Sequence, residues 1–259
     1  MLFNHHCLNS SVQTEVLDIA VEGTLNVLKV CSVMKVHKVV VLSSTASVSF
    51  NPHWPQDRPK DETCWSDKEF CKKNENWYAV AKVMAEQAAW EYADNNGLNV
   101  VTLCPPYVFG PLLQPTVNTS SKFLIYVIKG GPDAMSNVLW DFVDVRDVAD
   151  ALLLLYEKKE ASGRFNCTPY HICTRDLVDM LKKMYPKYKY VDKIVDADHA
   201  APATCQKLRD LGWEPRKLEE MLSDSVECYE EAGLLNDVPG HPCRLPYQVR
   251  LSFAHKDSK

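Results

Sequence analysis

The 259-residue sequence lacks any long uninterrupted run of apolar side chains. No run approaches the ~20 residues that a helix needs to span a bilayer, so we expect no membrane segment. The start of the chain has no basic segment followed by an apolar stretch, which a secretory signal peptide would show. Lysine and arginine (29) are outnumbered by aspartate and glutamate (34), which argues against a nucleic-acid-binding protein. These absences favour a soluble globular protein, which we expect to be cytoplasmic.

The chain also lacks the motifs that would bind a metal ion or a phosphate group. No two of its ten cysteines form a Cys-x-x-Cys pair, and no two histidines lie at helical ligand spacing. We therefore predict no metal site, and we expect reduced thiols, several of them buried. No glycine-rich loop of the kind that cradles a pyrophosphate occurs among the nine glycines.

What the chain does contain is an alternation of helical and strand-like segments. Periodic or alanine-rich stretches predict helices, and short β-branched runs predict strands that are buried on both faces. The predicted helices span 12–35, 77–94, 145–159, 174–184, 204–211 and 216–233, and the predicted strands span 39–44, 99–104 and 164–168. This alternation predicts an α/β fold with a doubly wound parallel sheet, covered by helices on both faces.

One serine, one tyrosine and one lysine form the most informative group of residues. Ser44 ends the apolar run VVVLSS, and Tyr78 and Lys82 lie one helical turn apart in WYAVAK. A phenol can protonate a carbonyl oxygen, and an ammonium group nearby makes it a better donor. A serine hydroxyl can polarise the same oxygen, and ligands of parallel sheets bind at the carboxyl ends of the strands. The group predicts a nicotinamide-dependent carbonyl reductase.

The spacing of Tyr78 and Lys82 alone also fits a packed ring and a solvated lysine on a surface helix. Tyr185 and Lys189 have the same spacing, but Pro186 lies between them and no strand-terminal serine precedes them. We therefore interpret that second pair as structural. The choice for the first pair depends on its surroundings.

Those surroundings match a known family over most of residues 12–235. The matching stretches are VVVLSSTASV, DETCWSDKEFCKKNENWYAVAKVMAEQAAWEYA, PPYVFGPLLQPTVNTSS, FVDVRDVADALLLLYE and ASGRFNC. With them, the chain resembles the extended short-chain dehydrogenase/reductases of plants, in the branch of cinnamoyl-CoA reductases and dihydroflavonol reductases. The resemblance implies a Rossmann-like fold and an NADP-dependent oxidoreductase. Its partner would be a small aromatic substrate, a phenylpropanoid-like carbonyl or thioester.

The resemblance also assigns roles to individual residues. It implies that Ser44, Tyr78 and Lys82 form the catalytic triad. The residues that it places at the cofactor are Leu42, Ser43, Tyr78, Lys82, Pro105, Tyr107 and Val108. The candidates for substrate contact are Thr45, Phe123 and Tyr126, with core packing as the alternative for the two rings. Asp144 stands where family members have a histidine, and we expect it to cap a helix.

The chain departs from the family pattern in two respects. Family members open with a strand, a glycine-rich turn and a helix, so we expect an N-terminally truncated Rossmann-like sheet that binds NADPH weakly. Cinnamoyl-CoA reductases place basic residues for coenzyme A where this chain has Phe123, Tyr126 and Thr174. One alternative is thus a catalytically silent fragment or interaction protein. A sugar-nucleotide epimerase or dehydratase, which shares the triad, is another.

The expected domain organisation follows from this resemblance. Residues 1–168 would form a partial NAD(P)-binding Rossmann-like domain, and 169–235 would supply a smaller substrate lobe. The segment 236–259 is rich in proline and basic residues without a helical period, so we predict a loosely ordered tail.

Overall fold

A computed structural model describes residues 10–247 and 249, which fall into two compact units. Unit 1 contains the residues up to Pro105, together with Asp150–Cys167 and Ala203–Trp213. Unit 2 contains Pro106–Ala149, Thr168–Pro202 and the residues from Glu214 onward. The chain passes between the units several times, so each is assembled from segments that are distant in sequence, and neither corresponds to a single stretch such as 1–168.

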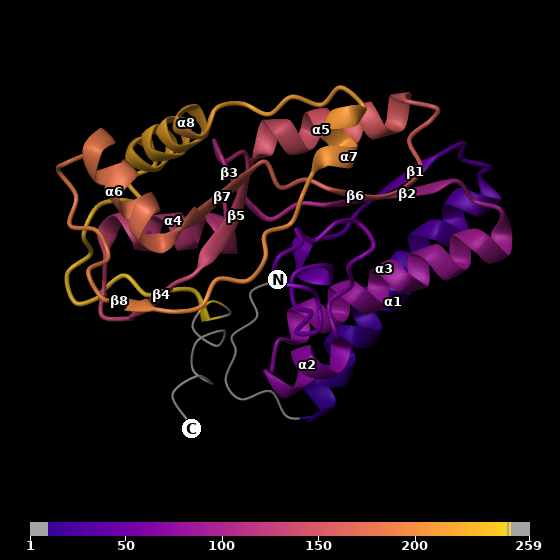
Figure 1. The fold of residues 1–259 in the computed structure, drawn as a ribbon, viewed down its shortest axis with the longest axis horizontal. Helices are drawn as coiled ribbons and strands as arrows, with labels where there is room; N and C mark the ends of the chain where they lie inside the picture. Colours follow the sequence, from indigo (N-terminus) through magenta and orange to yellow (C-terminus); the bar gives the residue numbers. More distant parts are fainter. Residues whose placement is uncertain (1–9, 248, 250–259) are drawn as a thin grey trace. The chain divides into compact units, whose positions relative to one another are not determined.

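Unit 1 is built on a three-stranded parallel sheet with the order β1-β2-β6 (Figure 1). Its strands are β1 (Val39–Leu42), β2 (Val100–Cys104) and β6 (Gly163–Asn166). The register places Leu42 beside Leu103, and Cys104 beside Asn166. The three predicted strands are therefore confirmed, and β2 is buried along its whole length, as a central strand should be.

Helices lie on both sides of this sheet (Figure 1). The long helices α1 (Ser10–Val33) and α3 (Trp77–Asn96) pack against each other on one side. On the other side are α7 (Gln206–Asp210) and the part of α5 (Val145–Glu157) that belongs to unit 1. The short helices η1 (Thr45–Ser47) and α2 (Lys68–Lys73) complete the unit. The predicted doubly wound arrangement is thus confirmed for this sheet.

Helix α3 owes its bounds to residues at its two ends. The side chain of Asn76 accepts a hydrogen bond from the amide of Ala79, which satisfies one of the free donors of the first turn. Gly97 ends the helix with a φ of 62°, a left-handed conformation that glycine adopts without strain. These two residues determine where the helix that carries Tyr78 and Lys82 begins and ends.

Unit 2 contains two further sheets. A mixed sheet has the order β3-β5-β7, and a separate parallel pair joins β4 to β8. The strands are β3 (Tyr107–Phe109), β4 (Met135–Asn137), β5 (Leu139–Asp144), β7 (Tyr170–Cys173) and β8 (Ile194–Asp196). The helices are α4 (Thr119–Lys129), α6 (Thr174–Met184) and α8 (Leu218–Glu231). The sequence patterns predict α6 and α8, but they predict neither α4 nor any of these five strands.

Aromatic rings fill the core of unit 2. The ring centroid of Phe123 lies 4.7 Å from that of Trp140, and the centroids of Phe109 and Phe142 are also 4.7 Å apart. Leu245 and Val249 are buried in the same core. The tail from residue 236, expected to be loosely ordered, is therefore packed at these two positions, because both side chains are apolar. Residues 248 and 250–259 lie outside the described part.

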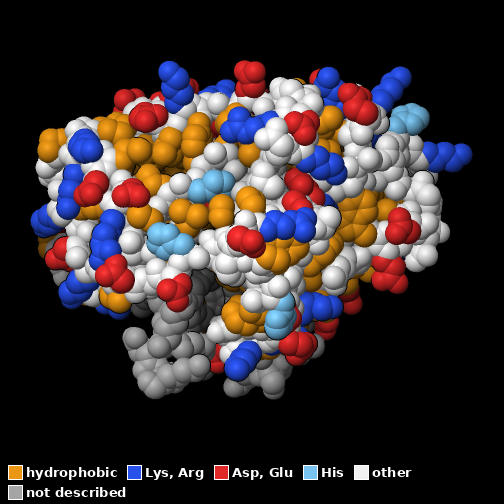
Figure 2. Space-filling view, in the orientation of Figure 1, with side chains coloured by type: hydrophobic (Ala, Val, Ile, Leu, Met, Phe, Trp, Pro, Cys, Tyr) orange, Lys and Arg blue, Asp and Glu red, His pale blue; other side chains and the backbone are white. Residues whose placement is uncertain are grey.

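The surface and the cysteines agree with the composition. On the face shown in Figure 2, acidic and basic side chains are interspersed rather than gathered by sign. Six of the nine cysteines in the described residues are buried, as expected for several of them. Within residues 10–247 and 249, no helix combines the length and the apolar character that a membrane span requires.

Candidate active site

Ser44 lies at the carboxyl end of strand β1, as predicted. The amide of Ser43 still donates to the carbonyl of Leu103 (2.8 Å), so the sheet holds the chain up to the residue before Ser44. Ser44 then caps the single turn η1, where its Oγ accepts a hydrogen bond from the amide of Ala46 (3.1 Å). The hydroxyl oxygen is thereby held by the backbone of the turn that it caps.

Tyr78 and Lys82 lie in the first two turns of helix α3 and share one of its faces. The Tyr78 side chain is 49% exposed, although its neighbours Ala79 and Val80 are fully buried. The Nζ atom of Lys82 lies 5.8 Å from the centroid of the Tyr78 ring. The ammonium group is therefore close to the ring of the proposed proton donor.

The other predicted site residues divide between the two units. Leu42, Ser43, Thr45 and Pro105 belong to unit 1 with the triad. Leu42 is half exposed at the end of β1, and the carbonyl of Pro105 accepts a hydrogen bond from the Thr45 amide (2.9 Å). The remaining four, Tyr107, Val108, Phe123 and Tyr126, belong to unit 2.

Phe123 and Tyr126 lie on α4 and are completely buried. The phenol of Tyr126 donates to the carbonyl of Asp133 (2.5 Å), and burial raises its pKa to about 12. Both rings therefore lie in the hydrophobic core, which agrees with the alternative that they are packing residues and do not contact the substrate. Asp144 caps α5 as expected, because its carboxylate accepts a hydrogen bond from the amide of Arg146 (2.8 Å).

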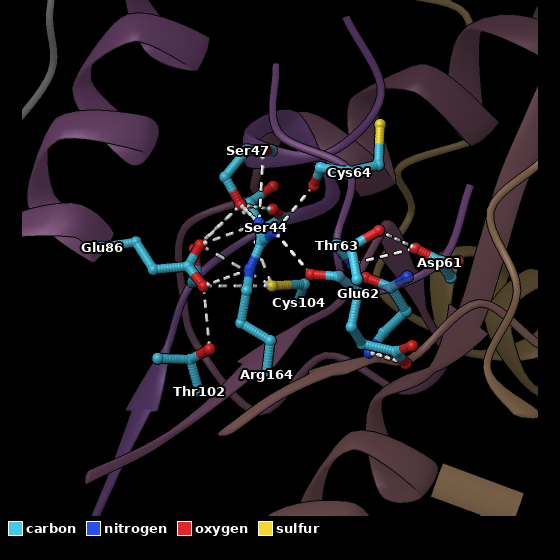
Figure 3. A network of polar contacts seen from close by, with 12 residues as sticks. Ser44, Ser47, Asp61, Glu62, Thr63, Cys64, Glu86, Thr102, Cys104 and Arg164 are labelled. Carbon is cyan, nitrogen blue, oxygen red and sulfur yellow. Dashed lines mark hydrogen bonds and ion pairs between the residues drawn. The ribbon is translucent and has the colours of Figure 1, made fainter. Parts of the chain in front are cut away.

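Sequence reasoning missed a buried ion pair in unit 1, between Glu86 of α3 and Arg164 of β6 (Figure 3). The Nε atom of Arg164 donates to Oε1 of Glu86 at 2.7 Å, and neither side chain has appreciable exposure. Ser43, Ser47 and Thr102 donate their hydroxyls to the same carboxylate over 2.6 to 2.8 Å. One available signal was an arginine inside a strand predicted to be buried on both faces, since a buried charge requires a partner.

The charges of this network are fixed near neutral pH. Burial by itself raises the pKa of the Glu86 carboxyl, but the charge of Arg164 and the serine hydrogen bonds outweigh it, so the pKa lies below its usual value. For the neighbouring thiol of Cys104, burial and then the charge of Glu86 raise the pKa to about 12. Glu86 is therefore ionised and Cys104 is a neutral thiol.

Comparison with known proteins places the chain among reductases. The family described as NAD dependent epimerase/dehydratase matches residues 4–168. Cinnamoyl-CoA reductase 1 of Petunia hybrida is 39% identical over 225 residues, which are 85% of this chain and 68% of that protein. Cinnamoyl-CoA reductase 1 of Arabidopsis thaliana is 38% identical over 225 residues, 85% of this chain and 65% of that protein.

Solved structures of reductases share the fold. Vestitone reductase from alfalfa superposes with a TM-score of 0.75 at 29% identity, covering 85% of this chain and 73% of that one. Gre2 from Candida albicans in complex with NADPH gives a TM-score of 0.72 at 27% identity, covering 88% and 75%. The predicted Rossmann-like fold and the predicted family resemblance are thus confirmed. The chain belongs to the NAD dependent epimerase/dehydratase family of extended short-chain dehydrogenase/reductases, and plant cinnamoyl-CoA reductases are among its relatives.

Proposed function

We propose that the chain is an NADP-dependent reductase of an aromatic, phenylpropanoid-like carbonyl compound. The observation that carries this proposal is the placement of Ser44 at the end of β1 and of Tyr78 and Lys82 on one face of α3. The relationship to cinnamoyl-CoA reductases and the NADPH complex of Gre2 support it.

The donors of Tyr78 and Lys82 suit the nicotinamide-ribose end of NADPH. Tyr78 offers a hydroxyl and Lys82 an ammonium group to the ribose hydroxyls, and the half-exposed Leu42 offers an apolar contact for the ring. Ser43 and Pro105, which belong to the same unit, are proposed to complete this contact. When bound, NADPH supplies the hydride for the carbonyl carbon.

The three polar side chains then have separate tasks. Tyr78 donates the proton to the carbonyl oxygen, and Lys82 stabilises the phenolate that remains. Ser44 orients the same oxygen: its Oγ accepts from the Ala46 amide, so its own hydrogen is available for the substrate. Thr45, the next residue of the turn, is proposed to contact the substrate. Phe123 and Tyr126 shape unit 2 from its core.

Replacing the proposed acid tests this assignment. We expect Tyr78→Phe to lower kcat/KM for an aromatic aldehyde by about 10²- to 10⁴-fold with an unchanged melting temperature, because only the proton donor is lost. The matched control is Tyr92→Phe, which removes a phenol oxygen from the same helix. Rates are measured with NADPH raised to saturation. A fall of less than about tenfold rejects Tyr78 as the acid, and a wild-type chain without turnover rejects the function in favour of the silent alternative.

We further propose that a free aldehyde or ketone is a better substrate than a coenzyme A thioester. Phe123, Tyr126 and Thr174 replace the basic residues of cinnamoyl-CoA reductases, and all three are fully buried. Each lost charge-assisted hydrogen bond weakens binding by roughly 1.5–3 kcal/mol. We expect a higher kcat/KM for coniferaldehyde than for feruloyl-CoA, and the reverse order contradicts this proposal.

A further inference from the structure

We propose that Glu86 and Arg164 are positioning residues that hold the segment 43–47 on helix α3, and thereby fix Ser44 relative to Tyr78 and Lys82. The inference rests on the proposed function, because it concerns the same site. It assigns a role to the buried ion pair, which contacts neither substrate nor cofactor in the mechanism above.

Glu86 lies on the same helix as the proposed acid. Tyr78, Lys82 and Glu86 follow one another at intervals of four residues, so they lie along one side of α3. Tyr78 is half exposed and Lys82 is partly buried, whereas Glu86 is buried and accepts a hydrogen bond from Thr102 of the sheet. Any group that is fixed to Glu86 is therefore fixed to the helix of the proposed acid.

Glu86 accepts hydrogen bonds from two serines of the segment 43–47. Its Oε2 atom lies 2.6 Å from Oγ of Ser43 and 2.6 Å from Oγ of Ser47. These two serines stand on either side of Ser44 along the chain. One carboxylate thus joins both flanks of the Ser44 turn to α3, and hydrogen bonds to an ionised acceptor are short and directional.

The hydrogen-bond network also includes Ser44 itself (Figure 3). Oγ of Ser47 also lies 2.8 Å from the carbonyl oxygen of Ser44, so its single hydrogen can go to either acceptor. Arg164 Nη2 donates to that Oγ over 3.0 Å and to the Ser47 carbonyl over 3.3 Å. Arg164 therefore holds the Ser47 hydroxyl whichever acceptor takes its hydrogen, and when that acceptor is the Ser44 carbonyl, the Ser44 backbone is held as well.

Arg164 is held by contacts beyond Glu86. Its Nη1 donates to the carbonyl of Cys64 at 2.7 Å, and its guanidinium lies 3.7 Å from the ring centroid of Trp65. The arginine is therefore fixed by strand β6, by the loop around Trp65 and by Glu86 at once. Such a framework leaves the Ser44 turn little freedom to shift.

Stability alone does not explain this arrangement. Well-packed apolar side chains often stabilise a core as well as a buried ion pair does. An apolar pair, however, cannot direct hydrogen bonds to the serines beside Ser44. Reaction rates depend on placement, because a displacement of about 1 Å can lower a rate about 10²-fold. Positioning accounts for the polar character of the site.

Ser47→Ala and Thr102→Val provide a matched test in the full chain. Each variant removes one hydroxyl that donates to the Glu86 carboxylate, from the Ser44 turn in one case and from strand β2 in the other. Backbone hydrogen exchange of 43–48 is measured by mass spectrometry. We expect Ser47→Ala to accelerate exchange there and Thr102→Val to leave it near that of the wild type. Equal exchange in both variants overturns the proposal.

Kinetics add a readout that a merely structural role would not move. We expect Ser47→Ala and Glu86→Gln to lower kcat by about 10- to 100-fold in the folded protein, with little change of KM. Glu91→Gln, at an exposed position of α3, is the control. Since Ser47→Ala keeps the ion pair, it decides the matter even if Glu86→Gln does not fold. An unchanged kcat in Ser47→Ala overturns the positioning role while the reductase function stands. Absence of wild-type turnover overturns the proposed function. The hydrogen-exchange measurements on Ser47→Ala and Thr102→Val then still test whether Glu86 restrains the segment 43–47.

Discussion

The two compact units differ in one part of their buried interiors. Unit 1 places the ion pair of Glu86 and Arg164 between its sheet and α3, and unit 2 places Phe109, Phe123 and Phe142 among its strands and α4. Hydrogen bonds fix both distance and direction, whereas ring packing mainly fixes volume. The proposed catalytic groups are found in the unit that contains this buried hydrogen-bond network.

Each unit also contains a buried carboxylate that pairs with an arginine and whose pKa is shifted. In unit 1, Glu86 and Arg164 are both buried, and the pKa of the carboxyl is lowered. In unit 2, Asp147 is buried but its partner Arg216 is 31% exposed. There burial outweighs the hydrogen bonds from Arg216, and the pKa of the Asp147 carboxyl is raised. In these two pairs, the carboxyl whose arginine is equally buried has the lowered pKa, and the carboxyl whose arginine is partly exposed has the raised one.

The largest effect is expected from breaking the ion pair of unit 1. Arg164→Met should lower the free energy of unfolding by about 3–5 kcal/mol, because it leaves the buried Glu86 without a countercharge. Urea denaturation measures this loss. The control is Arg175→Met in unit 2, which breaks an exposed pair with Asp196 and should cost less than about 1 kcal/mol. Equal losses in the two variants would show that Glu86 does not depend on Arg164.

A smaller effect is expected from a matched change in the aromatic core. Phe142→Leu keeps the fully buried position of unit 2 apolar and nearly filled. We expect a loss of about 1–2 kcal/mol in the same denaturation experiment, because a core tolerates apolar substitutions of similar volume. A loss greater than that of Arg164→Met would reverse the order of the two cores.

The elements that sequence patterns predicted carry local signals. Strand β1 is a run of valines and leucine, and helix α3 has an asparagine cap, many alanines and a terminal glycine. Such signals act within a few residues, so they can be recognised without knowledge of the fold. The same holds for Ser44, Tyr78 and Lys82, which stand at the ends or on one face of these elements.

The elements that were missed depend on their surroundings. Helix α4 is apolar on nearly all sides over FLIYVI, and a short apolar run without alternation does not separate helix from strand. Strands β4 and β8 have three residues each, and they exist because they pair with each other. Glu86 and Arg164 are 78 residues apart, and on an alanine-rich helix a glutamate suggests a solvated face. Only the tertiary structure shows that this face is buried.

The smallest expected effect is a difference in acid sensitivity between the two buried carboxylates. The folded-state pKa of Glu86 lies below its ordinary value of 4.5, so its contribution to stability is complete above about pH 4.5 and is lost as the pH falls through the folded pKa. For Asp147 the folded-state pKa lies above its ordinary value of 3.8. The sign is therefore reversed: its contribution is complete below that value and is lost as the pH rises through the folded pKa. Urea denaturation at about pH 7 and about pH 3.5 should show the stability gap between the wild type and Glu86→Gln shrinking on acidification. The gap between the wild type and Asp147→Asn should change in the opposite direction. Gaps that move together would show that the two carboxylates are ionised alike, and the contrast between the units would then lie in their packing alone.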